Sequence, residues 1–259
     1  MTIYRLAVLG DPVEHSRSPI LHETMLDLAG LQGSYERIRA DRNVLSRMVA
    51  GLRKGEWHGF NVTMPLKEAA AEVADDLSPP AQRSRSVNTL LVDQGRIGGH
   101  STDSTAFRAL LEHDRFAHHG TILVIGSGGS AAAALAAIDP GRRVYVSARR
   151  PERAAVLTST FGADLVAWGA GVAGALVINA TPMGMSGESL PEGILAASRG
   201  LIDLPYGDTA TPAIRWAERT GTPHVDGHEF LIRQAIESFR LWTGVEIRYS
   251  HLTDALRNV

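Results

Sequence analysis

The sequence contains no cysteine. This absence excludes disulfides, thiolate metal sites and cysteine nucleophiles, and it fits a reducing compartment. Long hydrophobic runs are also lacking, since no stretch approaches the roughly 20 apolar residues that a membrane-spanning helix needs. The N-terminal stretch MTIYRLAVLGDPVEHS turns polar too early for the apolar region of a signal peptide. We therefore expect a cytoplasmic protein that does not associate with a membrane.

Neither sign of charge dominates: 26 lysines and arginines oppose 28 aspartates and glutamates, and the formal net charge is -2. Such a balance excludes strong electrostatic attraction to nucleic acid or to an anionic membrane. The 259 residues suffice for one large domain or two modest ones, and the hydrophobic share of 44% is typical of a globular protein. We therefore expect a small molecule as the partner, bound by a monomer or a homodimer.

Short apolar runs typical of strands alternate with longer helical patterns through most of the chain. This rhythm indicates the α/β class with largely parallel sheets. Residues 93–103 are expected to form a turn, and Pro65 is expected to be a first helical residue. In this half we predict strands at 4–9, 35–39, 59–64 and 88–92, and helices at 18–29, 45–54, 65–77 and 104–113.

A buried strand, TILVI, restarts the alternation in the second half, so we place a domain boundary near residue 100. Residues 101–229 would form the second domain, with further strands at RVYVSA, ADLVAW, ALVINA and RGLIDL. The final helices, EFLIRQAIESFRLWTG and SHLTDALRN, have no following strand to cover. We therefore expect residues 230–259 to return to the first domain, residues 1–100.

The strand TILVI leads into Gly126, Gly128 and Ala131, which match the pattern G-x-G-x-x-A, and a helical stretch begins at once. Glycines in such a turn let the backbone approach a pyrophosphate, whose charge the helix N-terminus favours. The motif therefore predicts a dinucleotide site. The alternative is a tight strand-to-helix connection without a ligand.

Three arginines, Arg149, Arg150 and Arg153, follow the next strand, where a dinucleotide-binding fold places the residue that contacts the ribose. An acidic residue there would bind the 2′-hydroxyl of NAD. Arginines instead bind the 2′-phosphate of NADP through bidentate, charge-assisted hydrogen bonds. We therefore predict NADP as the cofactor, and a solvated basic turn is the alternative.

Two serines, Ser16 and Ser18, follow the first strand and stand one residue apart before a proline. In an extended segment both hydroxyls can face a ligand, and hydroxyls suit a carboxylate or ring alcohols. Helix capping is the alternative for Ser18, because a proline at the first helical position is itself a start signal.

Asn61, Thr63 and Lys67 come from FNVTMPLK, at the carboxyl end of a strand, where open α/β sheets bind ligands. The two-residue period of a strand places Asn61 and Thr63 on one face. Lys67 falls in the first helical turn, where the helix dipole disfavours a cation. A lysine in this position suits proton exchange with a ligand. The alternative is an exposed lysine beside Glu68.

Asn88, in SVNTL, and Asp103, in HSTDSTAF, complete the polar set of the first half. For Asp103 the alternative is a cap on the helix that follows it. His113, His118 and His119 also cluster, but they lie in a polar connector without partnering carboxylates. We therefore predict no metal site.

Seven short segments occur in the order and spacing of shikimate dehydrogenases: GDPVEHSRSP, FNVTMPLK, SVNTL, STD, GSGGSA, NATPMGM and DGHEFLIRQA. This resemblance implies an N-terminal α/β substrate domain and a C-terminal Rossmann-type NADP-binding domain. It also implies that the C-terminal helices pack back on the first domain. The activity it implies is an oxidoreductase that reversibly reduces 3-dehydroshikimate to shikimate in aromatic amino-acid biosynthesis.

The same resemblance implies a role for each matching residue. Lys67 and Asp103 would be the acid/base pair at the reacting oxygen. The substrate would be bound by Ser16, Ser18, Asn61, Thr63, Asn88, Tyr206 and Gln234. The NADP phosphates and adenosine would be bound by Gly126, Ser127, Gly128, Gly129, Ser130, Arg149, Arg150 and Arg153. The nicotinamide end would be lined by Thr181, Met183, Leu204 and Gly227.

Some positions depart from the family pattern, and they concern the support of Asp103 and the cofactor preference more than the fold. They are Ser101, Ala106, Ala148, Arg150, Asp208 and Phe230.

Three other functions stay open. A paralogue that prefers quinate would use similar ring contacts, although Ser18 favours shikimate. A non-catalytic ligand sensor would not need both Lys67 and Asp103, and a methylenetetrahydrofolate dehydrogenase has no evident use for HSRSP.

Overall fold

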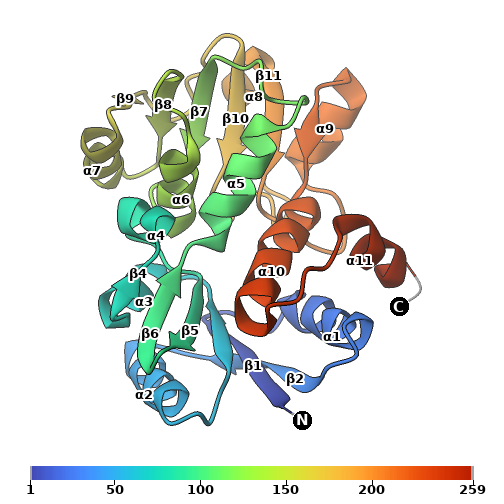
Figure 1. Ribbon diagram of the computed structural model, residues 1–259. Helices are drawn as coiled ribbons and strands as arrows, with labels where there is room; N and C mark the ends of the chain where they lie inside the picture. The colour runs from blue at the N-terminus through green and yellow to red at the C-terminus, as the bar shows by residue number, and fades with distance from the viewer. Residues whose placement is uncertain (1, 258–259) are drawn as a thin grey trace. The chain divides into compact units, whose positions relative to one another are not determined.

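The computed structural model describes residues 2–257, so Asn258 and Val259, at the end of the segment predicted to return to the first domain, lie outside the described residues. The chain divides into two compact units. The first unit comprises the residues up to Thr105 together with those from Ile232 onward, and the second comprises Ala106–Leu231. Each unit contains one six-stranded sheet flanked by helices (Figure 1), so the predicted α/β class is confirmed.

The first unit combines parallel and antiparallel strands. Its strands are β1 (Ile3–Gly10), β2 (Gln32–Arg39), β3 (Gly59–Val62), β4 (Asp76–Leu77), β5 (Thr89–Asp93) and β6 (Arg96–His100). Their order in the sheet is β2-β1-β3-β5-β6-β4. The strand β1 is parallel to β2 and β3, whereas β5 is antiparallel to β3 and β6. Parallel β1 and β3 therefore end at the same edge of the sheet, where the segments predicted to bind substrate begin.

Helices cover both faces of this sheet. They are α1 (Ser18–Leu28), α2 (Arg42–Arg53), α3 (Lys67–Val73), α4 (Pro79–Ser84) and α11 (Tyr249–Leu256), while α5 (Thr102–Glu112) and α10 (Gly227–Thr243) each contribute residues to both units. Along β1, Ala7 and Leu9 are buried with side chains of α2 and α3, whereas Leu6 and Val8 are buried on the other face near Trp242 of α10. Figure 1 shows α2 and α1 on opposite sides of β1. The last helix, α11, contacts α1.

The prediction that residues 93–103 form only a turn is wrong, because β6 lies within them and pairs with β5 as a hairpin. Gln94 and Gly95 form the connection, and both have the positive φ angles, 48° and 79°, that tight hairpins require. Glycines in β6 concealed the strand from the hydrophobic pattern. Gly99 needs to be small, since a Cβ atom there would lie 2.9 Å from the Cβ atom of Ala74.

The helix predicted at 65–77 is shorter than expected at both ends. Pro65 lies in a turn rather than in the helix, and α3 begins two residues later at Lys67. The helix ends at Val73 because the chain then pairs with β6: the Asp75 amide donates to the Ile97 carbonyl, and β4 follows. Sheet pairing therefore prevails over the helical propensity of this stretch, and Lys67 becomes the first residue of α3.

All strands of the second sheet are parallel. They are β7 (Thr121–Ile125), β8 (Arg143–Ser147), β9 (Asp164–Leu165), β10 (Ala175–Asn179), β11 (Ser198–Asp203) and β12 (His224–Val225), in the order β12-β11-β10-β7-β8-β9. This is the order of the doubly wound dinucleotide-binding sheet, in which ligands bind beyond the carboxyl ends of the strands where the order reverses. Here that point lies between β7 and β10.

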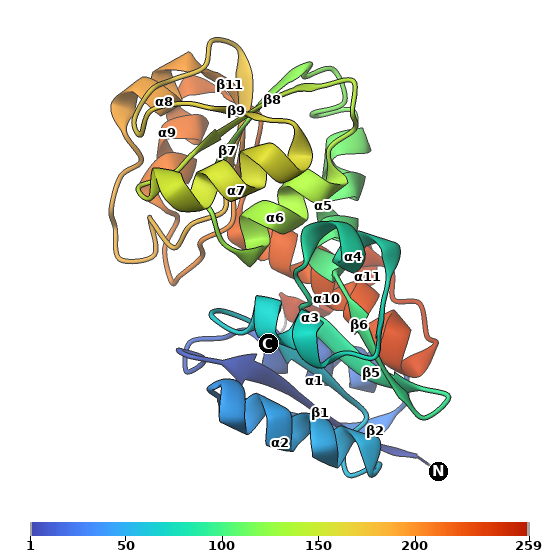
Figure 2. The ribbon, with the colours of Figure 1, turned by 90° about the vertical axis from the view of Figure 1, so that its left-hand side faces the viewer.

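The second sheet is also covered on both faces. Its helices are α6 (Gly129–Ala137), α7 (Pro151–Phe161), α8 (Glu192–Ala197) and α9 (Pro212–Thr220). Along β7, Ile122 and Val124 are buried with residues of α5, α6 and α7, whereas Leu123 and Ile125 are buried with residues of α8 and α9. Figure 2 shows α6 and α7 together on one side of this sheet. Within residues 2–257, no helix has both the length and the apolar character that a bilayer crossing requires.

Candidate functional site

Lys67 and Asp103 form an ion pair in the first unit. The distance between Lys67 Nζ and Asp103 Oδ2 is 2.5 Å, and the two side chains are only 15% and 7% exposed. Lys67 is the first residue of α3, and Asp103 is the second residue of α5. Asp103 does not cap α5, since the Ser104 amide donates instead to Ser101 Oγ. A buried pair of this kind depends on both partners, because removing either one leaves a desolvated charge unpaired.

Asn88 orients the carboxylate of this pair. Its Nδ2 donates to Asp103 Oδ1 at 3.1 Å and to Gln234 Oε1 at 3.1 Å. The same Nδ2 lies 2.8 Å from Thr102 Oγ1, and Asn88 Oδ1 accepts from the Thr102 amide at 2.7 Å. Asn88 is 3% exposed and Gln234 is 7% exposed. The predicted residues Lys67, Asp103, Asn88 and Gln234 therefore belong to one buried network.

Asn61 joins this network through the Asn88 carbonyl. Its Nδ2 lies within hydrogen-bonding distance of three acceptors: the Asn88 carbonyl at 3.1 Å, Thr89 Oγ1 at 3.2 Å and Ser238 Oγ at 3.0 Å. On its other side, Asn61 Oδ1 accepts from the Tyr35 hydroxyl at 2.7 Å. Asn61 therefore ties β3 to β5 and α10, in addition to any contact with a ligand.

Four members of the network were not predicted from the sequence: Tyr35, Thr89, Thr102 and Ser238. The hydroxyls of Thr102 and Ser238 lie 3.1 Å apart, and the Ser238 hydroxyl also donates to the Gln234 carbonyl. One signal could have identified Ser238: it stands four residues after Gln234, so both lie on the same face of a helix. Tyr35 gives no such signal, since its contact with Asn61 is made across the sheet.

Ser16 and Ser18 lie in the segment after β1, and Thr63 follows the neighbouring strand β3. Ser18 is the first residue of α1, whose cap position is Arg17, so Ser18 does not cap the helix. Its amide donates to Ser16 Oγ at 3.3 Å. Arg37, on β2, fixes this segment by donating to the Ser16 carbonyl through Nε at 2.9 Å and Nη2 at 2.7 Å. The two serines are thus held beside each other at the carboxyl edge of the sheet.

In the second unit, the glycine turn lies where the strand order reverses. Gly126 directly follows β7 and has a φ of 124°, a conformation that favours glycine. A Cβ atom on Gly126 would lie 3.0 Å from the Ala180 carbonyl and 3.2 Å from Thr181 Cγ2, so the turn touches the segment after β10. Gly128 occupies the cap position of α6, and a Cβ atom there would meet nothing within 4 Å. The turn thus combines open backbone with a helix N-terminus.

The predicted arginines follow β8, the neighbour of β7, and so lie at the same edge of the sheet as the glycine turn. Arg149, Arg150 and Arg153 are all exposed. Arg150 is the cap residue of α7 but makes no side-chain cap hydrogen bond. Backbone N–H groups, first that of Glu188 itself and then those of Gly184 and Ser186, lower the pKa of Glu188, and the positive charge of Arg149 lowers it further.

Four further predicted residues lie at the carboxyl ends of β10, β11 and β12. Thr181 follows β10, and both its amide and its hydroxyl donate to Asn179 Oδ1, at 3.1 and 2.7 Å. The Met183 amide donates to Thr181 Oγ1 at 3.1 Å. Gly227, after β12, lies against Leu204, after β11, since a Cβ atom on the glycine would come within 2.3 Å of the Leu204 carbonyl oxygen. The structure therefore brings Thr181 beside Gly126, and Leu204 beside Gly227.

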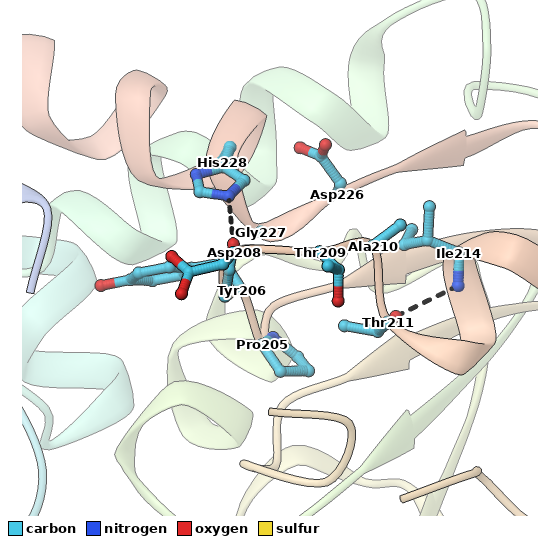
Figure 3. Close-up of a pocket in the computed structure, with 11 residues that line it drawn as sticks. Pro205, Tyr206, Asp208, Thr209, Ala210, Thr211, Ile214, Asp226, Gly227 and His228 are labelled. Carbon is cyan, nitrogen blue, oxygen red and sulfur yellow. Dashed lines mark hydrogen bonds between the residues drawn. The ribbon is translucent and has the colours of Figure 1, made fainter. Parts of the chain in front are cut away.

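Tyr206 belongs to the second unit, whereas the other predicted substrate residues belong to the first. It lines a pocket of about 200 Å³ formed by the loop after β11 and the start of α10. Its ring lies 5.3 Å from that of His228, which is hydrogen-bonded to the Gly207 carbonyl. Figure 3 shows the Tyr206 phenol and the Asp208 carboxylate extending to the same side of this loop. Among residues 2–257, no group of three or more histidines, aspartates or glutamates is placed to hold a metal ion.

Two family models match parts of the chain. The model described as the shikimate dehydrogenase substrate binding domain matches residues 8–90. The model described as the shikimate 5′-dehydrogenase C-terminal domain matches residues 227–257. Both matches fall on segments that supply the buried network of the first unit.

Full-length relatives extend the similarity over nearly all of the chain. A shikimate dehydrogenase (NADP(+)) of Alkalilimnicola ehrlichii is 36% identical over 273 residues, which cover 98% of each chain. One of Thermus thermophilus is 37% identical over 257 residues, covering 98% of this chain and 97% of the relative. A crystal structure of shikimate 5-dehydrogenase from Thermus thermophilus in complex with NADP(H) and shikimate is 35% identical, with a TM-score of 0.86, and the match covers 99% of each chain.

Proposed function

The chain belongs to the shikimate dehydrogenase family, and we propose that it catalyses the reversible, NADP-dependent reduction of 3-dehydroshikimate to shikimate. The observation that carries this proposal is the buried ion pair of Lys67 and Asp103, 2.5 Å apart. Reduction of a ketone requires a proton donor at the carbonyl oxygen, and this pair holds an ammonium among groups suited to bind a hydroxylated ring. The enzyme would act in the cytoplasm, in aromatic amino-acid biosynthesis, as a monomer or a homodimer.

Lys67 transfers the proton in this proposal. A ketone that receives a hydride becomes an alkoxide, and a positioned ammonium stabilises and protonates that oxygen. Bound NADPH would supply the hydride. Asp103 accepts a hydrogen bond from Lys67 Nζ, and Asn88 holds the other carboxylate oxygen, so the direction of the Nζ–H groups is set before the substrate arrives. In the oxidation direction, the neutral amine accepts the proton of the substrate hydroxyl.

The choice of lysine at position 67 supports this role. Lys54 and Lys67 are the only lysines in the sequence. All its other basic side chains, histidines aside, are arginines. A guanidinium remains charged throughout the physiological pH range and cannot exchange a proton, whereas an ammonium can. A purely structural partner for Asp103 has no need to be lysine in a chain that otherwise uses arginine. This signal is visible in the sequence and was missed there.

The remaining predicted residues divide between the two units. The first unit would bind the substrate: Ser16 and Ser18 would hold its carboxylate, while Thr63, Asn88 and Gln234 would contact the ring together with Asn61. Tyr206, in the second unit, would lie beside the substrate. Hydroxyl and amide groups suit these roles because they donate and accept hydrogen bonds with alcohols without adding charge.

The second unit fits NADP. The open backbone at Gly128 and the N-terminus of α6 suit a pyrophosphate, and exposed arginines after β8 suit a 2′-phosphate. Gly126, Ser127, Gly129 and Ser130 would complete the phosphate turn, with Arg149, Arg150 and Arg153 at the adenosine. Thr181, Met183, Leu204 and Gly227 would line the nicotinamide end.

A steady-state assay tests the proposal. The purified chain is offered NADPH or NADH with dehydroshikimate or dehydroquinate, and the loss of reduced-nicotinamide absorbance is followed. We expect turnover with NADPH and dehydroshikimate and a lower kcat/KM with the other three pairs. Higher kcat/KM with dehydroquinate would instead identify a quinate-preferring enzyme. No turnover with any pair, in a protein that still binds NADPH, would contradict the proposal and favour a ligand sensor.

A further inference from the structure

Asp203 is a carboxylate in the second unit with no solvent exposure, and the proposed mechanism does not use it. It ends β11, and both of its oxygens accept hydrogen bonds from neutral groups. Asn179 Nδ2 donates to Oδ1 at 2.6 Å, and the Thr211 hydroxyl donates to Oδ2. Burial raises the pKa of Asp203 to about 6 against the effect of these two hydrogen bonds, and Asp226 raises it further. A buried carboxylate without a cation is costly, which calls for a function that an apolar residue could not serve.

The hydrogen bond from Asn179 identifies what Asp203 holds. Because Asn179 Nδ2 faces the carboxylate, Asn179 Oδ1 faces the other way and accepts from the Thr181 amide and hydroxyl. Asn179 Nδ2 also donates to the Met183 carbonyl at 3.0 Å. The side chain of Asn179 therefore fixes both ends of the segment from Thr181 to Met183. Because the carboxylate can only accept, it keeps Nδ2 on the side of Asp203 and Met183 and Oδ1 on the side of Thr181.

We propose that Asp203 is a positioning residue for the nicotinamide loop, residues 180–184, acting through the orientation of the Asn179 amide. This inference rests on the proposed function, in which Thr181 and Met183 line the nicotinamide end. The loop has little freedom to move alone. Gly184 has a φ of 112°, and a Cβ atom there would lie 3.3 Å from Thr211 Cβ, so the far end of the loop also packs on a partner of Asp203.

Thr211 offers a matched comparison, because its hydroxyl bonds the same carboxylate but caps another element. The Thr211 atoms nearest Gly184 are Cβ and the Cγ2 methyl group, which a valine would keep. The Thr211 hydroxyl oxygen accepts from the Ile214 amide at 3.1 Å and so caps α9 (Figure 3). A Thr211→Val variant loses this cap and one hydrogen bond to Asp203, yet it leaves the Asn179 amide facing the carboxylate. It is therefore expected to lower thermal stability while leaving the nicotinamide loop in place.

The test measures the dissociation constant of NADPH by fluorescence titration and the KM for dehydroshikimate in the same variants. In Asp203→Asn, one acceptor oxygen is replaced by a donor, so the carboxamide cannot accept from both Asn179 and Thr211. We expect the Kd for NADPH to rise about tenfold, as for loss of a buried hydrogen bond to a charged group. The KM for dehydroshikimate should stay within about twofold of the parental value, because the first unit is untouched. Thr211→Val should keep the parental Kd.

A swapped pair separates positioning from general destabilisation. Combining Asp203→Asn with Asn179→Asp places the carboxylate at position 179, where it accepts from Thr181 and from the new amide, while the amide oxygen at position 203 accepts from Thr211. Only the Met183 carbonyl loses its donor. The Kd for NADPH should return to within about threefold of the parental value. If Asp203→Asn alone does not fold, the test rests on the double variant, which should fold and bind NADPH.

Three results would overturn the inference: a folded Asp203→Asn protein with the parental Kd, equal losses in Asp203→Asn and Thr211→Val, or a swapped pair that does not recover binding. Each is a binding measurement and needs no turnover. Failure of the parental protein to reduce dehydroshikimate would instead contradict the proposed function, and the Kd values of the variants would still be decisive for Asp203.

Discussion

In the first unit, the predicted catalytic pair and the predicted ring-binding residues other than Thr63 are bonded within one largely buried network, whereas the arginines predicted to bind the cofactor in the second unit are exposed. The Lys67 and Asp103 side chains are 15% and 7% exposed, and Asn88 Nδ2 donates both to the Asp103 carboxylate and to Gln234 Oε1. Electrostatic groups act most strongly where water is excluded and where they need not reorganise. Exposed arginines attract a phosphate, but water and salt screen them. We therefore expect the effect of a substitution to decrease as the exposure of the replaced side chain increases.

The largest effect on activity is expected from substitution of Lys67, in the buried ion pair of the first unit. Lys67→Ala should lower kcat by about 10²-fold or more with little change in KM, because the alkoxide loses its proton donor. Lys67→Arg should lower kcat similarly while keeping a cation beside Asp103, since arginine does not release its proton. Initial rates of NADPH oxidation measure both. Lys54→Ala, at an exposed position, is the matched control. A Lys67→Arg enzyme at the parental rate would remove proton transfer from the role of this residue.

His22 tests how well water is excluded from the first unit. The imidazole is fully buried in α1, stacked on Tyr35 with ring centroids 4.4 Å apart, and burial lowers its pKa from 6.5 to about 3. The folded protein thus holds His22 neutral while the unfolded chain protonates it. The stability of the folded protein is therefore unaffected by His22 titration above pH 6.5, and it decreases as the pH falls from 6.5 towards 3.

Between pH 8 and pH 5, this linkage should remove about 2 kcal/mol from the free energy of unfolding. Urea titrations at the two pH values, compared between the parental protein and His22→Leu, measure it. The variant should lose less stability on acidification than the parent does. His251→Gln, at an exposed position of α11, should show the parental pH dependence. An unchanged slope in His22→Leu would mean that protons reach His22 in the folded state.

The sequence predicted the alternation of elements well because most strands are short, apolar and bounded by turns, as TILVI and ALVINA are. It failed at β6, where Gly98 and Gly99 carry no hydrophobic signal, and at the end of α3, where sheet pairing decides the boundary. Most site residues followed from the family resemblance. The contact of Asn61 with Ser238 joins positions 177 residues apart, and no local pattern encodes that distance. Asp203 was missed because a buried acid at a strand end looks like any loop acid.

The exposed arginines after β8 test how much an exposed charge contributes to NADPH binding. Replacing Arg149 and Arg150 together by alanine should raise the KM for NADPH about tenfold through loss of charge-assisted hydrogen bonds to the 2′-phosphate. The KM for NADH, which has no such phosphate, should not change. Added salt should raise the parental KM for NADPH and shrink the difference. Arg143→Ala, at the other end of β8, is the control. Equal effects on both cofactors would assign these arginines no part in choosing between them.

The smallest effect on activity is expected from substitution of an exposed residue that only holds a substrate-binding segment in place. Arg37 is exposed, and it donates two hydrogen bonds to the Ser16 carbonyl, 2.9 and 2.7 Å long. Arg37→Gln should raise the KM for dehydroshikimate about threefold with an unchanged kcat, because the serine segment loosens while Lys67 stays in place. Arg42→Gln, which breaks an exposed ion pair with Glu72, removes the same charge without touching this segment. If both variants raise KM equally, long-range attraction of the carboxylate accounts for the change. If only Arg37→Gln raises the KM, the exposed Arg37 side chain contributes to substrate binding by ordering the segment that contains Ser16 and the buried Ser18.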